Sequence, residues 1–276
     1  MKKVCVIANA GKENATQVVE RIVAFFHENN VVIRVFWEDF SKREGCYRQV
    51  EPDTECAIVL GGDGTMLRAA SELSGMKIPV FGVNLGHLGF LAGTEVSELT
   101  EALQKLLAGE FFTEERMMLE VVSEGNLSDK ALNDVVVTRS GFSRIISISL
   151  YVNGTYVFTY RGDGLIVATP TGSTGYNLSA GGPIVVPTAE AILVTPICPH
   201  SLAARGLVLS AEDEVCLIIE EEKKTQDEEA IVTSDGYSSG KLAANDRLTI
   251  CRTKEKAYFI HLKEKSFFDL LQKKLG

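Results

Sequence analysis

The chain lacks any run of 18 apolar residues, the length expected of a helix that crosses a bilayer. Its first residues, Met1-Lys-Lys-Val-Cys-Val-Ile-Ala, hold too short an apolar run for a signal peptide. These two absences argue against a membrane-spanning protein and against a secreted precursor. We therefore expect a cytoplasmic protein with no membrane partner.

A cluster of basic residues is also missing. The sequence has 28 Lys and Arg against 37 Asp and Glu, which gives a formal net charge of -9. Binding along a nucleic acid needs Lys and Arg side chains gathered to neutralise phosphates. We therefore expect no nucleic-acid partner.

The six cysteines include no Cys-x-x-Cys pair, and the four histidines have no metal-ligand spacing. The sequence thus indicates neither a zinc site nor a disulfide framework, and we expect reduced, mostly buried thiols. We also expect His27 and His261 to be ordinary surface or core residues. His87 is expected to be structural in its glycine-rich loop, and His200 to border a ligand.

The first part of the chain alternates between strand and helix patterns. At 276 residues the chain exceeds the usual domain of about 100 to 200 residues, so we expect two domains. Continuous apolar runs indicate buried strands, and apolar residues at three- and four-residue spacing indicate helices. The pattern predicts strands at Val4 to Ala8, Val31 to Trp37, Cys56 to Leu60 and Pro79 to Val83, and helices through Val18 to Phe26, Thr65 to Leu73 and Val96 to Leu107. Such alternation is typical of a parallel α/β sheet.

From Phe112 onward the chain is rich in β-branched residues in alternating patterns. Asn153-Gly154 separates two such runs and predicts a hairpin turn. The predicted strands are Met118 to Ser123, Leu132 to Arg139, Ile145 to Val152, Tyr156 to Tyr160 and Leu165 to Thr169. The expected fold is an α/β N-terminal domain with a parallel sheet plus a mostly β C-terminal domain. We place the boundary near Phe111, which gives domains 1–111 and 112–255.

Two further segments carry expectations. Ser266 to Leu275 is expected to be a helix, and the tail 256–276 to pack back on the first domain. The acidic stretch Glu220 to Glu229 lies between the apolar runs Val215 to Ile219 and Ile231 to Val232. We expect it to be a solvated hairpin loop, with an acidic docking patch as the alternative.

One motif carries the chemistry. Gly61-Gly62-Asp63-Gly64-Thr65 lies where a predicted parallel strand meets the next helix, at the sheet edge where ligands bind. Glycines let backbone N–H groups approach phosphate oxygens, and a helix N-terminus adds a partial positive charge. Asp63 repels phosphate, so its presence suits a carboxylate that binds a cation shared with the phosphates or accepts a proton from an attacking hydroxyl. The alternative is a tight glycine turn capped by Asp63.

The motif and the segments that follow it resemble the NAD kinase family. The pentapeptide is shared with 6-phosphofructokinases and with diacylglycerol and sphingosine kinases, so alone it implies only phosphoryl transfer to a hydroxyl. The longer resemblance runs from about Val4 to Gly236. It is carried by Asn84-Leu-Gly-His-Leu-Gly-Phe-Leu, Asn133-Asp134, the run from Asp163 to Pro183, Pro199-His-Ser-Leu and Asp235-Gly236.

The resemblance implies a two-domain fold, α/β plus β-sandwich, that transfers the terminal phosphoryl of ATP, or of polyphosphate, to the 2′-hydroxyl of the adenosine ribose of NAD. It implies Asp63 as the catalytic residue and a phosphate-binding loop of Gly61, Gly62, Gly64 and Thr65. It places these residues at the substrate: Asp63, Gly64, Arg68, Asn133, Asp134, Arg144, Arg161, Asp163, Thr171, Thr174, Gly175, Tyr176, Asn177, Leu178, Ser179 and Cys198.

The residues themselves leave alternatives at several of these positions. Asn133 and Asp134 suit an adenine edge and ribose hydroxyls, or else a turn closed by their own side chains. Arg68 suits a phosphate, or else a solvated helix face. Tyr176 offers an aromatic face to a base or a nicotinamide ring. The segment from Thr169 to Gly182 is rich in glycine and hydroxyls and suits a polar ligand, or else a glycine-rich turn region without one.

The resemblance also implies partners. Mg²⁺ is expected to arrive with ATP, without a dedicated protein metal site. A homodimer or homotetramer is expected, with Asp163 reaching a neighbouring subunit's site. Two positions depart from the family pattern: Tyr237 follows Asp235-Gly236 where many members have Gln, and Gly175 stands where alanine is common. The rival functions are a lipid or sphingoid kinase and a non-catalytic NAD sensor.

Overall fold

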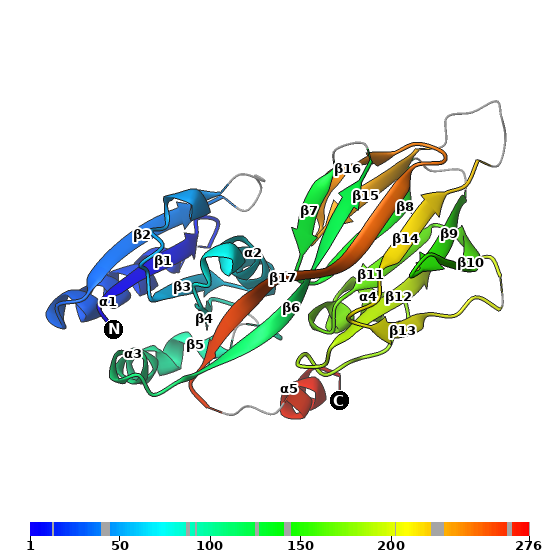
Figure 1. The fold of residues 1–276 in the computed structure, drawn as a ribbon. Coiled ribbons are helices and arrows are strands. Elements are labelled where there is room, and N and C mark those ends of the chain that lie inside the picture. The colour runs from blue at the N-terminus through cyan, green and yellow to red at the C-terminus, as the bar shows by residue number, and fades with distance from the viewer. Residues whose placement is uncertain are drawn as a thin grey trace. The chain divides into compact units, whose positions relative to one another are not determined.

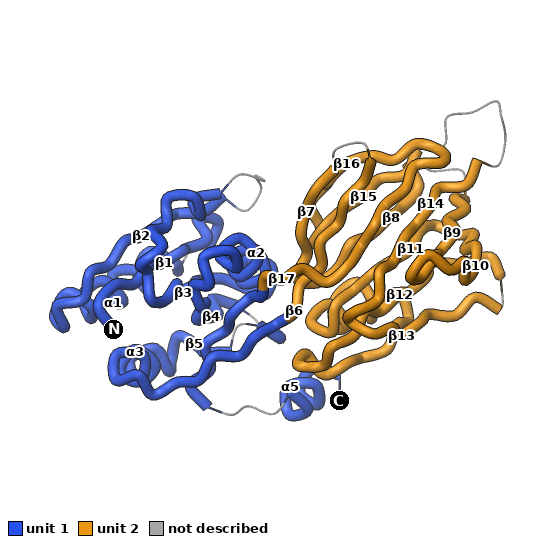
Figure 2. The backbone as a smooth tube through the Cα atoms, in the orientation of Figure 1, with its two compact units in different colours: residues 1–116, 256–276 blue, residues 117–255 orange. Residues whose placement is uncertain are grey.

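The computed structural model describes residues 1–12, 14–39, 45–86, 89–91, 93–124, 127–140, 145–201, 203–221, 229–263 and 267–275. Within them the chain divides into two compact units, 1–116 with 256–276, and 117–255 (Figure 2). Strands β6 (Phe112–Ser123) and β17 (Arg247–His261) each belong partly to both units.

The first unit contains a parallel sheet, as the sequence predicts (Figure 1). Its neighbouring strands follow the order β4-β3-β1-β2, and all of these pairs are parallel. The unit's elements are β1 (Lys3–Asn9), α1 (Ala15–Glu28), β2 (Val32–Glu38), the 3-10 turn η1 (Cys46–Gln49), β3 (Cys56–Gly61), α2 (Asp63–Leu73), η2 (Ser74–Met76), β4 (Val80–Asn84), β5 (Thr94–Glu95), η3 (Val96–Glu98), α3 (Leu99–Ala108) and α5 (Phe267–Leu275).

The two faces of this sheet are covered by different helices. The predicted apolar stripe of α1 is buried, and Ile22 and Phe26 pack with Leu103 and Leu106 of α3 against one face. Helix α2 lies on the other side in Figure 1. It begins at Asp63, two residues before the predicted start, because an acidic residue is favoured in the first turn of a helix.

The C-terminal helix forms where the sequence predicts it. In α5, the ring of Phe267 lies 6.4 Å from that of Phe90, and the Lys274 ammonium lies 4.5 Å from the Phe90 ring centre. Phe268 on the same helix is exposed. Among the described residues, no helix is both long and apolar enough to cross a membrane.

The second unit is mostly β, also as predicted. One sheet has the order β13-β12-β11-β8-β15-β16, and the strands β10-β9-β14-β17 pair in that order in the other, with β6 and β7. The unit's elements are β7 (Ser128–Ala131), β8 (Asp134–Arg139), β9 (Ile146–Val152), β10 (Thr155–Gly162), β11 (Gly164–Ala168), η4 (Thr171–Thr174), α4 (Tyr176–Ser179), β12 (Ala191–Ile197), β13 (Leu207–Ser210), β14 (Val215–Ile219), β15 (Ala230–Ser234) and β16 (Tyr237–Leu242), with parts of β6 and β17.

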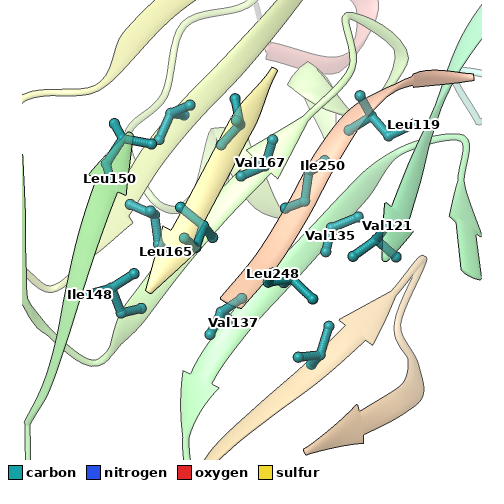
Figure 3. Packing of buried hydrophobic residues seen from close by; sticks show 14 of the residues in the cluster. Leu119, Val121, Val135, Val137, Ile148, Leu150, Leu165, Val167, Leu248 and Ile250 are labelled. Atoms are coloured by element: carbon teal, nitrogen blue, oxygen red, sulfur yellow. The ribbon is translucent and has the colours of Figure 1, made fainter. Parts of the chain in front are cut away.

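Alternate residues of the two sheets meet in one core. Figure 3 shows Val135 and Val137 of β8 with Leu165 and Val167 of β11, facing Ile148, Leu150, Leu248 and Ile250 of the other sheet. All of these side chains are buried. Because side chains alternate between the faces of a strand, the period-2 pattern of the sequence becomes the inner face of a sandwich.

The predicted hairpin at Asn153-Gly154 is confirmed. Strands β9 and β10 pair antiparallel with Val152 opposite Thr155, so the two turn residues form the whole loop. Both have positive φ, 50° at Asn153 and 76° at Gly154, as a two-residue hairpin of this type requires.

Two other expectations are wrong. The strands on either side of Glu220 to Glu229 do not form a hairpin: β14 pairs with β9 and β17, whereas β15 pairs with β8 and β16 in the other sheet. The two strands lie in different sheets, and pairing with strands distant in the sequence cannot be read from the local apolar pattern. Residues 222–228 lie outside the described part.

The second wrong expectation concerns the cysteines. All six are free as expected, but they are not mostly buried, because only Cys5 and Cys56 are fully buried.

Candidate active site

The glycine turn follows β3 and leads directly into α2. A Cβ atom on Gly61 would overlap with the side chain of Thr65, so the strand end can lie against the first helical turn only because this residue is glycine. Gly62 and Gly64 have no neighbouring atom within 4 Å of the place a Cβ would take. The turn is therefore open on one side, at a helix N-terminus, where backbone N–H groups favour an anion.

The carboxylate of Asp63 is held by a second segment. The backbone N–H of Phe90 donates to Oδ2 at 2.7 Å, and that of Leu91 donates to Oδ1 at 3.0 Å. Gly89 precedes them, and a Cβ there would overlap with the carboxylate. These contacts fix the orientation of Asp63. Sequence reasoning quoted this segment as part of the family resemblance but assigned no role to Phe90 or Leu91.

Arg68 is buried, so the solvated alternative for this residue is wrong. Only 5% of it is exposed; its Nη2 lies 3.1 Å from Oε1 of the buried Glu38, and its guanidinium lies 5.6 Å from the ring centre of Tyr47. Glu38 ends β2, whereas Arg68 is on the second turn of α2. Its charge is already offset by a carboxylate, and its binding of a phosphate stays a prediction.

Thr65 connects the helix to the first strand. Nδ2 of Asn9, the last residue of β1, donates to Oγ1 of Thr65 at 3.4 Å. The backbone N–H of Gly11 donates to Oδ1 of the same asparagine at 2.9 Å. The carboxyl ends of β1 and β3 thus lie together beside the glycine turn, as neighbouring parallel strands require.

In the second unit, Asn133 and Asp134 stand at the start of β8. The Oδ1 atom of Asn133 is buried and has no hydrogen-bond partner among the described residues. An unpaired buried acceptor is costly, so it marks a place where a ligand donor would be favoured. Asp134 is 6% exposed, and burial raises the pKa of its carboxyl to about 6.

Asp235 lies beside this pair. Burial raises the pKa of Asp235 to about 7, and the charge of Asp134 acts in the same direction. Backbone N–H groups of Leu132, Asn133 and Asp134 donate to its carboxylate and lower that pKa, but burial is the larger effect. The sequence contains Asp235-Gly236 as part of the family resemblance, but Asp235 was not among the predicted site residues.

The segment from Thr169 to Gly182 is held by buried polar side chains. Asn177 is fully buried: its Nδ2 donates to the carbonyls of Ser173 and Pro183 at 3.2 and 3.0 Å, and its Oδ1 accepts from Thr195 at 2.7 Å. The side chain of Asn177 is thus engaged within the protein and supports η4 and α4. Its predicted contact with a ligand remains untested.

Around Asn177, the structure places the other predicted residues of this segment at different depths. Tyr176 is 45% exposed and Ser179 is exposed, so both present side chains to solvent. Thr174, Gly175 and Leu178 are partly buried, and Thr171 is buried. Gly175 lies beside Asn133 and Asp134, because a Cβ there would stand 3.5 Å from the Asn133 Nδ2 and 3.8 Å from the Asp134 Oδ2.

Arg161, Asp163 and Cys198 lie near the junction of β10 and β11. Nε of Arg139 donates to Oδ1 of Asp163 at 2.8 Å, a pairing that the sequence did not predict. Cys198 is exposed and has a positive φ of 43°, and the N–H of His200 donates to the carbonyl of Arg161 at 2.9 Å. The predicted residues Arg144 and His87 lie outside the described part of the chain.

Among the described residues, no group of three or more His, Cys, Asp or Glu side chains is arranged to hold a metal ion. Asp63 is the single carboxylate of the glycine turn. Mg²⁺ is commonly bound by one or two carboxylates together with substrate phosphates, so one carboxylate fits an ion that arrives with its nucleotide.

Comparison with family models matches both units. Residues 4–111 match the model of the ATP-NAD kinase N-terminal domain, and residues 132–262 match that of the ATP-NAD kinase C-terminal domain. Among curated relatives, the NAD kinase of Lachnoclostridium phytofermentans is 51% identical over 285 residues, covering 100% of this chain and 99% of the relative. That of Agathobacter rectalis is 40% identical over 280 residues, with coverage of 100% and 99%.

Solved structures are similar over the same length. An NAD kinase from Archaeoglobus fulgidus in complex with ATP has a TM-score of 0.78 and 28% identity, covering 98% of each chain. Yeast NADH kinase complexed with NADH has a TM-score of 0.83, covering 100% of this chain and 87% of that one. At 24% identity the second likeness shows the fold alone.

Gly172 and Gly175 provide a matched pair of alanine substitutions. At Gly172 a Cβ would overlap with the carbonyl oxygen of Asn133 and lie 2.6 Å from its carbon, so backbone must move. At Gly175 the nearest atom is 3.3 Å away. We expect Gly172→Ala to lower the free energy of unfolding by about 1–3 kcal/mol, and Gly175→Ala to lower it less. Denaturant unfolding measures both, and equal losses would contradict the close approach at Gly172.

Asp134→Asn should make the protein more stable at alkaline pH. The folded-state pKa of Asp134 is raised to about 6 from an ordinary value of 3.8, so its stabilising contribution is complete below pH 3.8 and is lost as the pH rises through 6. Asparagine does not titrate and avoids this loss. We expect the variant to gain about 1–3 kcal/mol over the wild type at pH 8. The gain should shrink toward pH 4 in unfolding experiments, and a loss of stability equal at every pH would refute it.

Proposed function

Because the chain belongs to the ATP-NAD kinase family, we propose that it transfers the terminal phosphoryl group of ATP to the 2′-hydroxyl of the adenosine ribose of NAD, giving NADP. The observation that carries the phosphoryl-transfer part is the glycine turn, in which Asp63 begins α2 between two glycines that face open space. A lipid kinase or an NAD sensor would not require both this turn and the segment from Thr169 to Gly182.

The donor is assigned to the first unit. Gly61, Gly62, Gly64 and Thr65 place backbone N–H groups at a helix N-terminus, where they favour phosphate oxygens. Asp63 adds the only negative charge of the turn. Bound Mg²⁺ would neutralise charge that develops on the transferred phosphoryl group, and Asp63 is the residue of the turn that would hold it. We propose the same site for polyphosphate, which offers the same phosphoryl chemistry.

The acceptor is assigned to the second unit. The unpartnered Oδ1 of Asn133 suits a donor on the edge of adenine, and the buried carboxyl of Asp134 suits ribose hydroxyls. Tyr176 offers an exposed ring for a base or a nicotinamide. Thr171, Thr174, Gly175, Leu178 and Ser179 of the same unit are proposed to contact the dinucleotide, as are Arg161, Asn177 and Cys198. The family resemblance adds Arg144, which lies outside the described residues, and, in the first unit, Gly64 and Arg68 as proposed substrate contacts.

The reaction forms a bond between the 2′-oxygen and the γ-phosphorus and breaks the bond from that phosphorus to the bridging oxygen, so ADP leaves. The hydroxyl proton is released to Asp63 or, after transfer, to the new phosphate. Phosphoryl transition states are loose, so positioning and charge neutralisation contribute more than early removal of this proton. The two N–H donors that fix the Asp63 carboxylate fit an orienting role.

The reaction is tested directly with purified protein. We expect NADP to form when NAD and Mg²⁺ are supplied with ATP, and we expect polyphosphate to serve as a second donor. An NADP-specific dehydrogenase measures the product. Sphingosine and diacylglycerol are the control acceptors. Phosphorylation of a lipid without formation of NADP would replace this proposal with the lipid-kinase alternative.

Asp63→Asn separates the kinase from the sensor. Because the variant keeps the shape of the side chain but removes its charge and basicity, turnover should fall at least about 100-fold. NAD affinity, measured by calorimetry, should stay within about threefold of the wild type because NAD is assigned to other residues. Asp53→Asn, a surface change in the same unit, is the control. Equal turnover in Asp63→Asn and wild type would rule out the role given to Asp63.

The proposed enzyme has two functional domains, forms an oligomer and resides in one compartment of the cell. We take residues 1–111 with 256–276 and residues 112–255 as the two functional domains. We expect a homodimer or homotetramer in which Asp163 serves a neighbouring subunit, a state that light scattering would measure. We also expect the enzyme in the cytoplasm, since six free thiols suit a reducing compartment.

A further inference from the structure

Asp235 and Thr169 form hydrogen bonds with every backbone N–H and carbonyl group of the segment Leu132–Asp134. Each of its three N–H groups donates to the carboxylate of Asp235: Leu132 to Oδ2 at 2.8 Å, and Asn133 and Asp134 to Oδ1 at 2.7 and 3.2 Å. In return, the N–H of Asp235 donates to the carbonyl of Asp134 at 3.0 Å. One residue thus forms four hydrogen bonds to three consecutive residues.

Thr169 donates hydrogen bonds to the two remaining carbonyls of the segment. Its Oγ1 donates to the carbonyl of Leu132 at 2.6 Å, and its N–H donates to the carbonyl of Asn133 at 2.8 Å. The same hydroxyl accepts the N–H of Gly172 at 3.1 Å. Thr169 is completely buried, so these bonds form away from water, where losing one leaves an unpaired buried group.

This arrangement leaves the side chains of Asn133 and Asp134 as the polar groups of the segment that can turn to a ligand. The oxygens of Asp235 point toward backbone N–H groups, and its φ of 50° lies in the left-handed region, which aspartate adopts more readily than most residues. Gly172 lies against the carbonyl of Asn133 with no room for a Cβ, which closes the segment from the other side.

We propose that Asp235 and Thr169 are positioning residues for dinucleotide binding, which fix the Leu132–Asp134 backbone so that Asn133 and Asp134 meet NAD in one preset orientation. The proposal rests on the function proposed above. Neither residue needs to touch the ligand. Their effect is therefore expected on NAD binding, and neither on the phosphoryl donor nor on turnover once NAD is saturating.

Asp235→Asn and Thr169→Val test this in the full-length protein. Asparagine keeps the shape but loses the charge and one acceptor, whereas valine keeps the shape of threonine and loses the hydroxyl. We expect the KM for NAD to rise at least about tenfold in each. The KM for ATP and kcat at saturating NAD should stay within about threefold. Calorimetry should show the same loss in NAD affinity, and Thr169→Ser, which keeps the hydroxyl, should restore it.

Asp213→Asn is the matched control. The Asp213 carboxylate lies in the same unit and also bonds a nearby backbone, accepting from the N–H of Ser210 at 2.9 Å and from Nδ2 of Asn153 at 2.7 Å. It should lower stability without changing the KM for NAD. If Asp235→Asn and Thr169→Val behaved like this control, or lowered kcat with an unchanged KM, the two residues would be merely structural and the proposal would be overturned.

Failure of this inference can be told apart from failure of the proposed function. A wild type that makes NADP, with variants unchanged in NAD binding, overturns the inference alone. A wild type that binds NAD without making NADP overturns the kinase function, and calorimetry of the variants still decides the inference. A wild type that does not bind NAD overturns both.

Discussion

The hydrogen bonds from Asp235 and Thr169 to the backbone of Leu132–Asp134 connect three separate parts of the second unit. Asp235 follows β15, Leu132–Asp134 leads into β8, and Thr169 follows β11. These strands are neighbours in one sheet, with β8 between β11 and β15. The end of the sheet is thus fixed by a carboxylate and a hydroxyl beyond the last ladder pairs, and the candidate dinucleotide site depends on that order of strands.

In each unit, a glycine allows a backbone segment to lie very close to another backbone or side chain. Gly89 brings the Phe90 and Leu91 amides to the Asp63 carboxylate, and Gly172 lies against the carbonyl of Asn133. In both places a methyl group would displace a polar residue to which the proposed reaction assigns a role. Packing in proteins is dense enough for such a shift to be felt at the site.

The site holds charge at a cost to stability. Asp134 and Asp235 are close enough for the charge of Asp134 to raise the pKa of Asp235, and burial raises both. Arg68 and Glu38 form a buried ion pair beside the glycine turn, where desolvation offsets much of their attraction. Buried charged groups of this kind lower the stability of a core, but they fit the proposed role of orienting a polar ligand.

The sequence by itself determined the elements and the reaction class. Apolar periodicity located four parallel strands and three helices of the first unit and the strands β6, β8, β9, β10 and β11, but it did not identify β12, β13, β16 or the long β17. Asn153-Gly154 located a hairpin, and the motif at Gly61 to Thr65 with the run from Asp163 to Pro183 indicated the family. Tertiary structure alone decided which strands are neighbours, so that β14 and β15 fall in different sheets, and that Arg68 is buried against Glu38. It also decided that Asp235 bonds the backbone of Leu132–Asp134, about 100 positions away. Local patterns indicate which side chains of a segment are buried and which are exposed, whereas contacts between distant residues depend on how the whole chain packs.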